Sequence, residues 1–222
     1  MARRSFANLA VAVLVLVIAA CGEAVAPVDQ ASEQRPATVA ELRGPWRQAP
    51  LRLDVATRGR IEQACRREIE MPPGATAVVI DVRGAGVATI RIAGVNAGSC
   101  DALEISANGQ IAGAGAGWRA PGPDDAIGLP AGKLGHIEKQ TVGGGSLTVE
   151  GWSVYGRAGP GIASVVIEPQ NHLAVIATLQ NGWFAAWWPA QANRPNRDGA
   201  AHPPFVVRAY DPTGTLLDQI DS

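Results

Sequence analysis

The last third of the chain alternates apolar and polar positions in short runs. Turn residues separate these runs at 159–161, 169–171, 181–182 and 211–214. The strand-like runs are Leu147–Tyr155, Gly161–Glu168, Leu173–Gln180, Trp183–Trp188, Pro204–Tyr210 and Thr215–Ile220. Short strands at this spacing are typical of an antiparallel β-sandwich or a partly closed barrel, which we expect over residues 147–222.

Residues 46–143 follow a different pattern, with a helical stripe ahead of the strands. Apolar residues recur at helical spacing between Thr57 and Ile69, and Cys65 lies on that stripe. Two hairpins follow, pairing 77–82 with 87–93 and 102–106 with 110–117; residues 119–133 have the composition of a loop. We therefore expect a mainly β protein with one short α-helix, in which a small α+β unit (46–143) precedes the carboxyl-terminal β domain (147–222).

The dipeptide Asn181-Gly182 predicts a two-residue hairpin turn that sets the register of its strands. It places Leu179 opposite Phe184, Gln180 opposite Trp183, Ile176 opposite Trp187 and Val175 opposite Trp188. Because side chains alternate along a strand, one face is wholly apolar. Its members are Leu173, Val175, Ala177, Leu179, Phe184, Ala186 and Trp188.

The other face of this hairpin is mixed and carries Trp183 and Trp187 where a simple sandwich presents polar residues to water. Two tryptophans on such a face need cover. Either the amino-terminal unit or the segment Gln191–Pro203 packs over them, or they form a binding face for a sugar ring, a peptide or another subunit. The sequence leaves these alternatives open, and Trp183 and Trp187 are its candidate binding residues.

The first 20 residues have the organisation of an export signal. Arg3-Arg4 precedes an apolar core of about a dozen residues, shorter than the roughly 17–25 that span a membrane, and Ile18-Ala19-Ala20 leads into Cys21. This arrangement resembles a bacterial lipoprotein signal, which implies cleavage before Cys21 and lipidation of that cysteine. Residues 21–45 then form a flexible tether, and the protein is expected to be an extracytoplasmic lipoprotein anchored to the membrane of the cell envelope. Arg3-Arg4 also leaves the twin-arginine route open beside the general secretory one, and an unmodified cysteine or an uncleaved anchor stays an alternative.

Charge and cysteine usage agree with this location. The chain has a net charge of −1, and removal of Arg3 and Arg4 with the leader leaves about −3, which disfavours a nucleic-acid partner. Beyond Cys21 the remaining cysteines are Cys65 and Cys100. Outside the cytoplasm such a pair predicts a disulfide, with a buried free pair or a redox site as alternatives.

Three stretches carry a resemblance to a known family: Tyr155–Gly161, Asn181–Pro189 (Asn-Gly-Trp-Phe-Ala-Ala-Trp-Trp-Pro) and Val207–Gly214 (Val-Arg-Ala-Tyr-Asp-Pro-Thr-Gly). Over residues 147–220 the chain resembles a terminal β domain of uncharacterised secreted or membrane-linked proteins of actinobacteria and other high-GC bacteria. The resemblance implies an envelope β domain. It assigns no functional residue.

The chain contains no strong sequence motif for catalysis, metal binding or phosphate binding. His136, His172 and His202 lack metal-ligand spacing, and each is expected to face solvent. A nucleophile elbow is missing, and the glycines at 113, 115 and 117 lie in a strand-like run that does not favour a phosphate loop. Asp124-Asp125 lacks further spaced oxygen ligands for calcium. Asp81 and Glu104 form a possible acid–base pair, against which solvation or a salt bridge from Arg83 or Arg91 is the simpler interpretation.

These observations favour a non-enzymatic protein without a cofactor or metal, which binds an envelope protein or glycan through its aromatic face. The main alternative is an envelope hydrolase or glycan-active enzyme whose site is assembled from dispersed residues. A sensory lipoprotein is a third hypothesis.

Overall fold

The computed structural model describes residues 35–68, 76–84, 88–93, 97–101, 104–106, 110–112, 115–119, 128–142, 151–170, 172–190 and 202–222. The protein is mainly β, and every strand pair among these residues is antiparallel. This confirms the expected fold class, an open β-sandwich preceded by an α+β unit.

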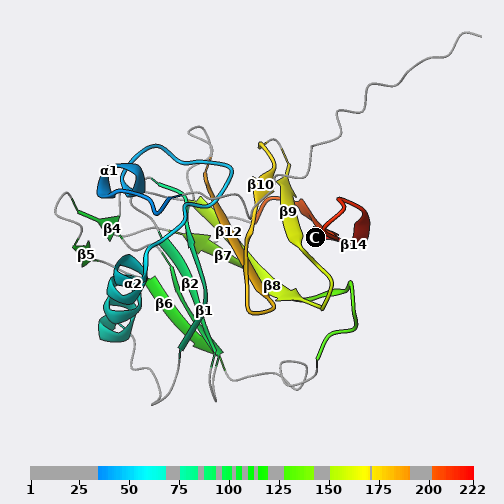
Figure 1. Ribbon diagram of the computed structural model, residues 1–222, viewed down its shortest axis with the longest axis horizontal. Helices are drawn as coiled ribbons and strands as arrows, with labels where there is room; N and C mark the ends of the chain where they lie inside the picture. The colour runs from blue at the N-terminus through cyan, green and yellow to red at the C-terminus, as the bar shows by residue number, and fades with distance from the viewer. Residues whose placement is uncertain are drawn as a thin grey trace, which may run out of the picture.

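Three four-stranded sheets and one helix form successive layers (Figure 1). The amino-terminal sheet has the order β1 (Thr76–Val82), β2 (Ala88–Ala93), β3 (Ala97–Asp101) and β6 (Gly115–Arg119). The central sheet has the order β11 (Thr178–Gln180), β12 (Trp183–Pro189), β8 (Gly151–Ala158) and β7 (Leu134–Val142). The outer sheet has the order β10 (Val175–Ile176), β9 (Ser164–Pro169), β13 (Phe205–Tyr210) and β14 (Leu216–Asp221).

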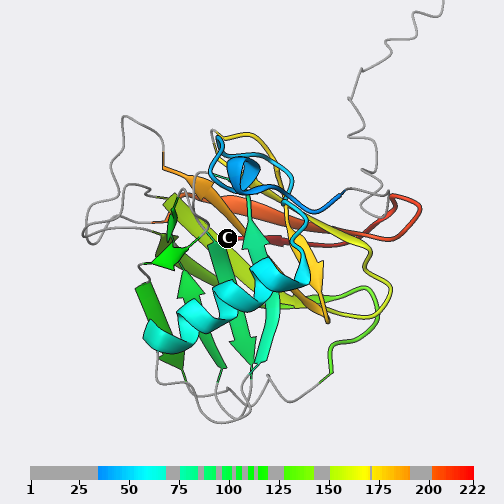
Figure 2. The same cartoon turned by 60° about the vertical axis from the view of Figure 1, so that its left-hand side comes forward.

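The helix α2 (Val55–Glu68) crosses the strands of the amino-terminal sheet on the side away from the central sheet (Figure 2). Ile61, Ala64 and Cys65 on its inner side are buried with Ile80 and Val82 of β1. The helix predicted over 57–69 is thus confirmed, because its apolar stripe has a sheet to pack against. The short strands β4 (Glu104–Ile105) and β5 (Ile111–Ala112) pair with each other beside this layer.

The expected boundaries between segments differ from the structure at two places. Residues 35–45, the last part of the expected tether (21–45), are part of the folded protein, because α1 (Val39–Leu42) begins with a capping box at Thr38 and Leu42 is buried in the core with residues of α2. The strand β7 pairs with β8 along its length, so the expected boundary at 143–147 separates two neighbouring strands of one sheet. The glycine triplet itself lies outside the described residues.

The predicted register of the tryptophan hairpin is confirmed near the turn. Gln180 pairs with Trp183 and Leu179 with Phe184, around a left-handed Asn181 and Gly182. Beyond that point the single strand expected over 173–180 divides: Val175 and Ile176 pair with β9 in the outer sheet, while residues 178–180 stay in the central sheet. The expected pairs Ile176–Trp187 and Val175–Trp188 are therefore wrong. Leu173, which the pattern assigned to the apolar face, is 64% exposed.

Candidate functional site

Trp183 and Trp187 lie on the face of the central sheet that is turned toward the amino-terminal sheet. Trp183 is 8% exposed and Trp187 is completely buried. Val78 and Val79 of β1 pack against Trp183, with Tyr155 and Ala185 in the same cluster. The expected binding face is thus an internal interface, and cover by the amino-terminal unit is the alternative that the structure shows. An adjacent layer of chain, which hairpin patterning does not reveal, supplies this cover.

A buried ion pair joins the layers at this interface. The Arg83 Nε lies 2.7 Å from Asp81 Oδ2, and both side chains are completely inaccessible to solvent. The Arg83 guanidinium also donates to the backbone carbonyls of Gln48 and Ile176. Asp81 accepts from the Thr178 hydroxyl at 2.6 Å and from the backbone N–H of Trp187. One side-chain pair therefore holds the amino-terminal sheet, the segment at Gln48, the central sheet and the outer sheet together.

Burial also sets the electrostatics of this pair. Desolvation raises the pKa of Asp81, while the Arg83 charge and the hydrogen bonds from Arg83, Thr178 and Trp187 act in the opposite direction. The salt bridge expected from Arg83 is confirmed. The Glu104 side chain, considered as an acid–base partner of Asp81, lies outside the described residues. Asp81 is engaged on both oxygens, so the structure shows it in a structural role.

A strap of residues 45–48 crosses from the amino-terminal sheet to the sandwich. The Trp46 indole donates to the Trp187 carbonyl at 3.0 Å, and Gln48 Nε2 donates to the Ala174 carbonyl at 3.0 Å. Gly84 makes the close approach of the strap possible, because a Cβ at this position would lie 2.5 Å from the Pro45 carbonyl oxygen at a φ of +88°. Sequence spacing alone contains no signal for this strap.

A polar cluster lies on the same face of the central sheet, at its β7 edge. His136 Nε2 is 2.7 Å from Glu138 Oε1, and the Tyr155 hydroxyl donates to the other oxygen of Glu138. Gln140 Nε2 in turn donates to the Tyr155 hydroxyl at 3.0 Å. His136 has a left-handed φ of 53° at a β-bulge between Gly135 and Glu138. Backbone strain at a bulge is a frequent feature of functional sites, so we define His136, Glu138, Gln140 and Tyr155 as the β7 polar cluster.

This cluster adjoins the more accessible of the two tryptophans. The His136 ring meets the Trp183 ring edge-on at 6.1 Å, and the Arg157 guanidinium lies over the Trp183 ring at 5.5 Å. The sequence predicted no strand over 134–142, because the bulge interrupts the alternation of apolar and polar positions. The cluster was therefore not among the expected sites.

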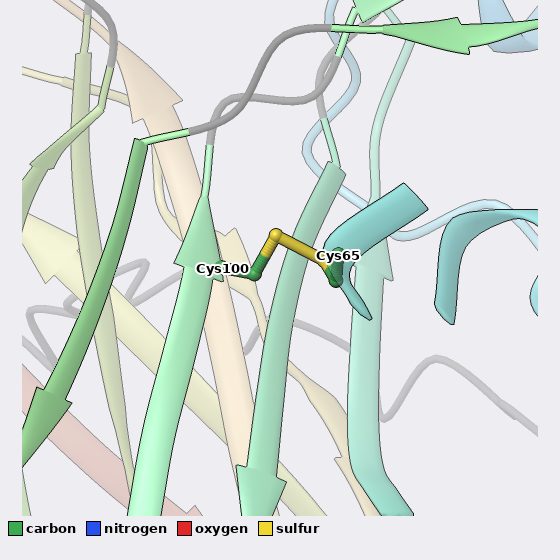
Figure 3. Close-up of a disulfide and its surroundings, with 2 residues drawn as sticks. All are labelled: Cys65 and Cys100. Carbon is green, nitrogen blue, oxygen red and sulfur yellow. A yellow bond between two sulfur atoms is a disulfide. The ribbon is translucent and has the colours of Figure 1, made fainter. Parts of the chain in front are cut away.

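The predicted disulfide is present. Cys65 of α2 and Cys100 of β3 are bonded at 2.14 Å with their Cα atoms 5.9 Å apart, which ties the helix to the amino-terminal sheet (Figure 3). Cys21 and the Asp124-Asp125 pair lie outside the described residues. The Cys65–Cys100 bond gives the α+β unit a covalent link between its helix and its sheet.

The three histidines are less exposed than expected. His172 packs edge-on against Trp46 at 5.1 Å. His202 lies among Trp152, Trp188 and Phe205, and its burial lowers its pKa. Within the described part of the chain, no three His, Cys, Asp or Glu side chains are grouped so that they would hold a metal ion.

No helix among the described residues is long and apolar enough to cross a membrane. Comparison with family models, with curated proteins and with solved structures finds no match.

Proposed function

We propose that the protein is a lipid-anchored, extracytoplasmic β protein that binds a protein partner in the cell envelope. The observation that carries this proposal is the Cys65–Cys100 disulfide, because such bonds form and persist in oxidising compartments. It agrees with the export signal that ends at Cys21. The anchor itself rests on the signal pattern alone.

The anchor is tested by labelling cells with a fatty-acid probe. We expect label on the wild-type protein and on a Gly22→Ala control, and loss of label with release into the medium for Cys21→Ser. Label that persists on the Cys21→Ser protein would overturn the proposed anchor. Unlabelled wild-type protein in the envelope would also contradict it.

The partner surface that we propose is the outward face of the outer sheet. Alternate residues of β9 and β13 point away from the core and are half-buried: Val166, Glu168, Val206, Arg208 and Tyr210. No described element lies over them. Arg208 forms an ion pair with Glu168 between the two valines, and this mixture of apolar and paired charged groups is typical of a non-obligate protein interface. The face replaces the buried tryptophans in the role expected from the sequence.

A photoreactive phenylalanine analogue at Tyr210 tests this surface in living cells. We expect a discrete protein adduct from position 210 and none from the control at Val55, which is 88% exposed on α2. An adduct with cell-wall glycan would replace the protein partner by a glycan. Equal adducts from both positions, or none, would overturn the outer sheet as the binding face.

The β7 polar cluster favours a second candidate, the envelope hydrolase with a dispersed site. A His–Glu pair hydrogen-bonded to a tyrosine has the composition of a general acid–base group. The test is hydrolysis of cell-wall glycan and ester substrates by the purified protein, with Glu138→Gln as the inactive variant and Glu168→Gln on the outer sheet as the matched control. Activity that survives Glu138→Gln, or no activity in the wild type, removes this candidate.

A further inference from the structure

Ser153 and Trp187, two directly paired residues of the central sheet, each have a buried side-chain polar atom that makes no hydrogen bond within the described part of the chain. Ser153 of β8 and Trp187 of β12 are opposite each other in register, and both are completely buried. These atoms are the Ser153 hydroxyl oxygen and the Trp187 indole nitrogen, for which the described residues supply no hydrogen-bond partner. Paired strand residues carry side chains on the same side of a sheet with Cβ atoms about 5 Å apart, so both side chains enter the layer between the central and amino-terminal sheets.

The neighbouring polar groups are already engaged. Asp81, which forms the buried ion pair with Arg83, accepts hydrogen bonds from Arg83 and from Thr178. On the other side, Gln140 pairs with Ser153 in register but donates its amide to Tyr155, whose hydroxyl donates to Glu138. The hydrogen bonds of Asp81, the Gln140 Nε2 group and the Tyr155 hydroxyl thus run to partners other than Ser153 Oγ and Trp187 Nε1.

The donor and acceptor capacity of the Ser153 hydroxyl and the Trp187 indole defines which hydrogen-bond partner would satisfy them. An indole N–H only donates, whereas a serine hydroxyl both donates and accepts. A single oxygen atom between them satisfies both, as an acceptor from Trp187 and as a partner of either kind to Ser153. Buried polar groups in native proteins are almost always satisfied, and an internal water is the common means where protein partners are lacking.

We propose that Ser153 Oγ and Trp187 Nε1 bind one internal water molecule between the central and amino-terminal sheets. The proposed water lies two residues along the strands from the Tyr155–Glu138 pair. It extends the polar character of the β7 polar cluster into the interior and links β8 to β12 through their side chains. This site is separate from the outer-sheet surface and does not depend on the function proposed for it.

A high-resolution crystal structure of the protein with Cys21→Ser tests the site directly. We expect one spherical density peak within about 2.7–3.2 Å of both atoms. A protein side chain or an empty space between the two atoms would overturn the proposal. A larger, non-spherical density would replace the water by the hydroxyl group of a small ligand and would overturn it equally.

Nuclear magnetic resonance provides the same test in solution. The Trp187 indole resonance is assigned with a Trp187→Phe variant, and we expect it to show a cross-peak to long-lived water. Ser153→Ala should shift this resonance and weaken the cross-peak, whereas Ser164→Ala on the outer sheet should change neither. The proposal is wrong if the wild-type indole has no water cross-peak, or if both alanine variants affect it alike.

Discussion

The two faces of the central sheet come from the same strands but form different kinds of interface. Toward the outer sheet, Val154, Phe184, Ala186 and Trp188 pack into a continuous apolar core. Toward the amino-terminal sheet, the neighbouring positions are Ser153, Tyr155, Ala185 and Trp187, and the contacts include hydrogen bonds and an ion pair.

The difference shows how each pair of layers is held together. Apolar burial is non-directional and tolerates many arrangements of side chains. The polar interface requires particular partners, because each buried polar group that loses its partner is costly. We therefore expect the sandwich to depend on apolar volume, and the docking of the amino-terminal sheet to depend on a few specific side chains.

The largest expected effect comes from breaking the buried ion pair. Arg83→Met leaves Asp81 buried without its counter-charge, which should lower the free energy of unfolding by about 3–5 kcal/mol. The double variant Asp81→Val/Arg83→Met removes both charges and should be more stable than Arg83→Met alone. Urea unfolding of Asp81→Val, of Arg83→Met and of the double variant measures the coupling between the two side chains. Additive losses would show that the two residues do not act as a pair.

A somewhat smaller effect is expected from removal of the disulfide. The bond closes a loop with a sequence separation of 35. On the chain-entropy model, Cys65→Ala/Cys100→Ala should then cost about 3–4 kcal/mol. We expect amide hydrogen exchange to accelerate in β1 and β2 more than in β9 and β13, since the sandwich core contains neither cysteine. A uniform acceleration across all three sheets would contradict the distinction between the two interfaces.

The smallest expected effect is a pH dependence of the free energy of unfolding, which arises from His202 beside the apolar core of the sandwich. Burial lowers the pKa of His202 below 6.5, so the unfolded chain binds this proton more tightly than the folded protein. The stabilising contribution is present above about pH 6.5 and is lost as the pH falls toward the folded-state pKa. The unfolding midpoint should therefore fall as the pH is lowered from 8 to 5. His202→Gln should remove this decrease, and His172→Gln should retain it. A slope that persists without His202 would assign it to another group.

Local patterns predicted the elements whose partners are close in sequence. The Asn181-Gly182 turn set the register of Gln180 with Trp183, and the stripe of Ile61, Ala64 and Cys65 predicted α2. These predictions succeed because turn chemistry and side-chain periodicity act over a few residues.

Local patterns failed where the chain changes partner or loses its alternation. Ala177 lies between a segment that pairs with β9 and one that pairs with β12, and no turn residue marks this change. The bulge at Gly135–Glu138 concealed β7 and with it the β7 polar cluster. In both cases the partner strands lie near in sequence, but neither a turn residue nor an unbroken alternation of apolar and polar positions marks the pairing.

The sequence by itself determined the class of the fold and the turn of the tryptophan hairpin, because both depend on residue type and short spacing. It also determined the cysteine pair, because Cys65 and Cys100 are the two cysteines that follow Cys21. Only the tertiary structure decided that Trp183 and Trp187 are covered, that Asp81 and Arg83 join three sheets, and that Ser153 meets Trp187. Burial and long-range partners are properties of how layers stack. Residues that meet between the layers here are far apart in the chain, as Asp81 and Thr178 show at a separation of 97 and Trp46 and Trp187 at a separation of 141. The same tryptophans that a hairpin pattern presents to solvent thus become the centre of an interface once a second sheet lies on them.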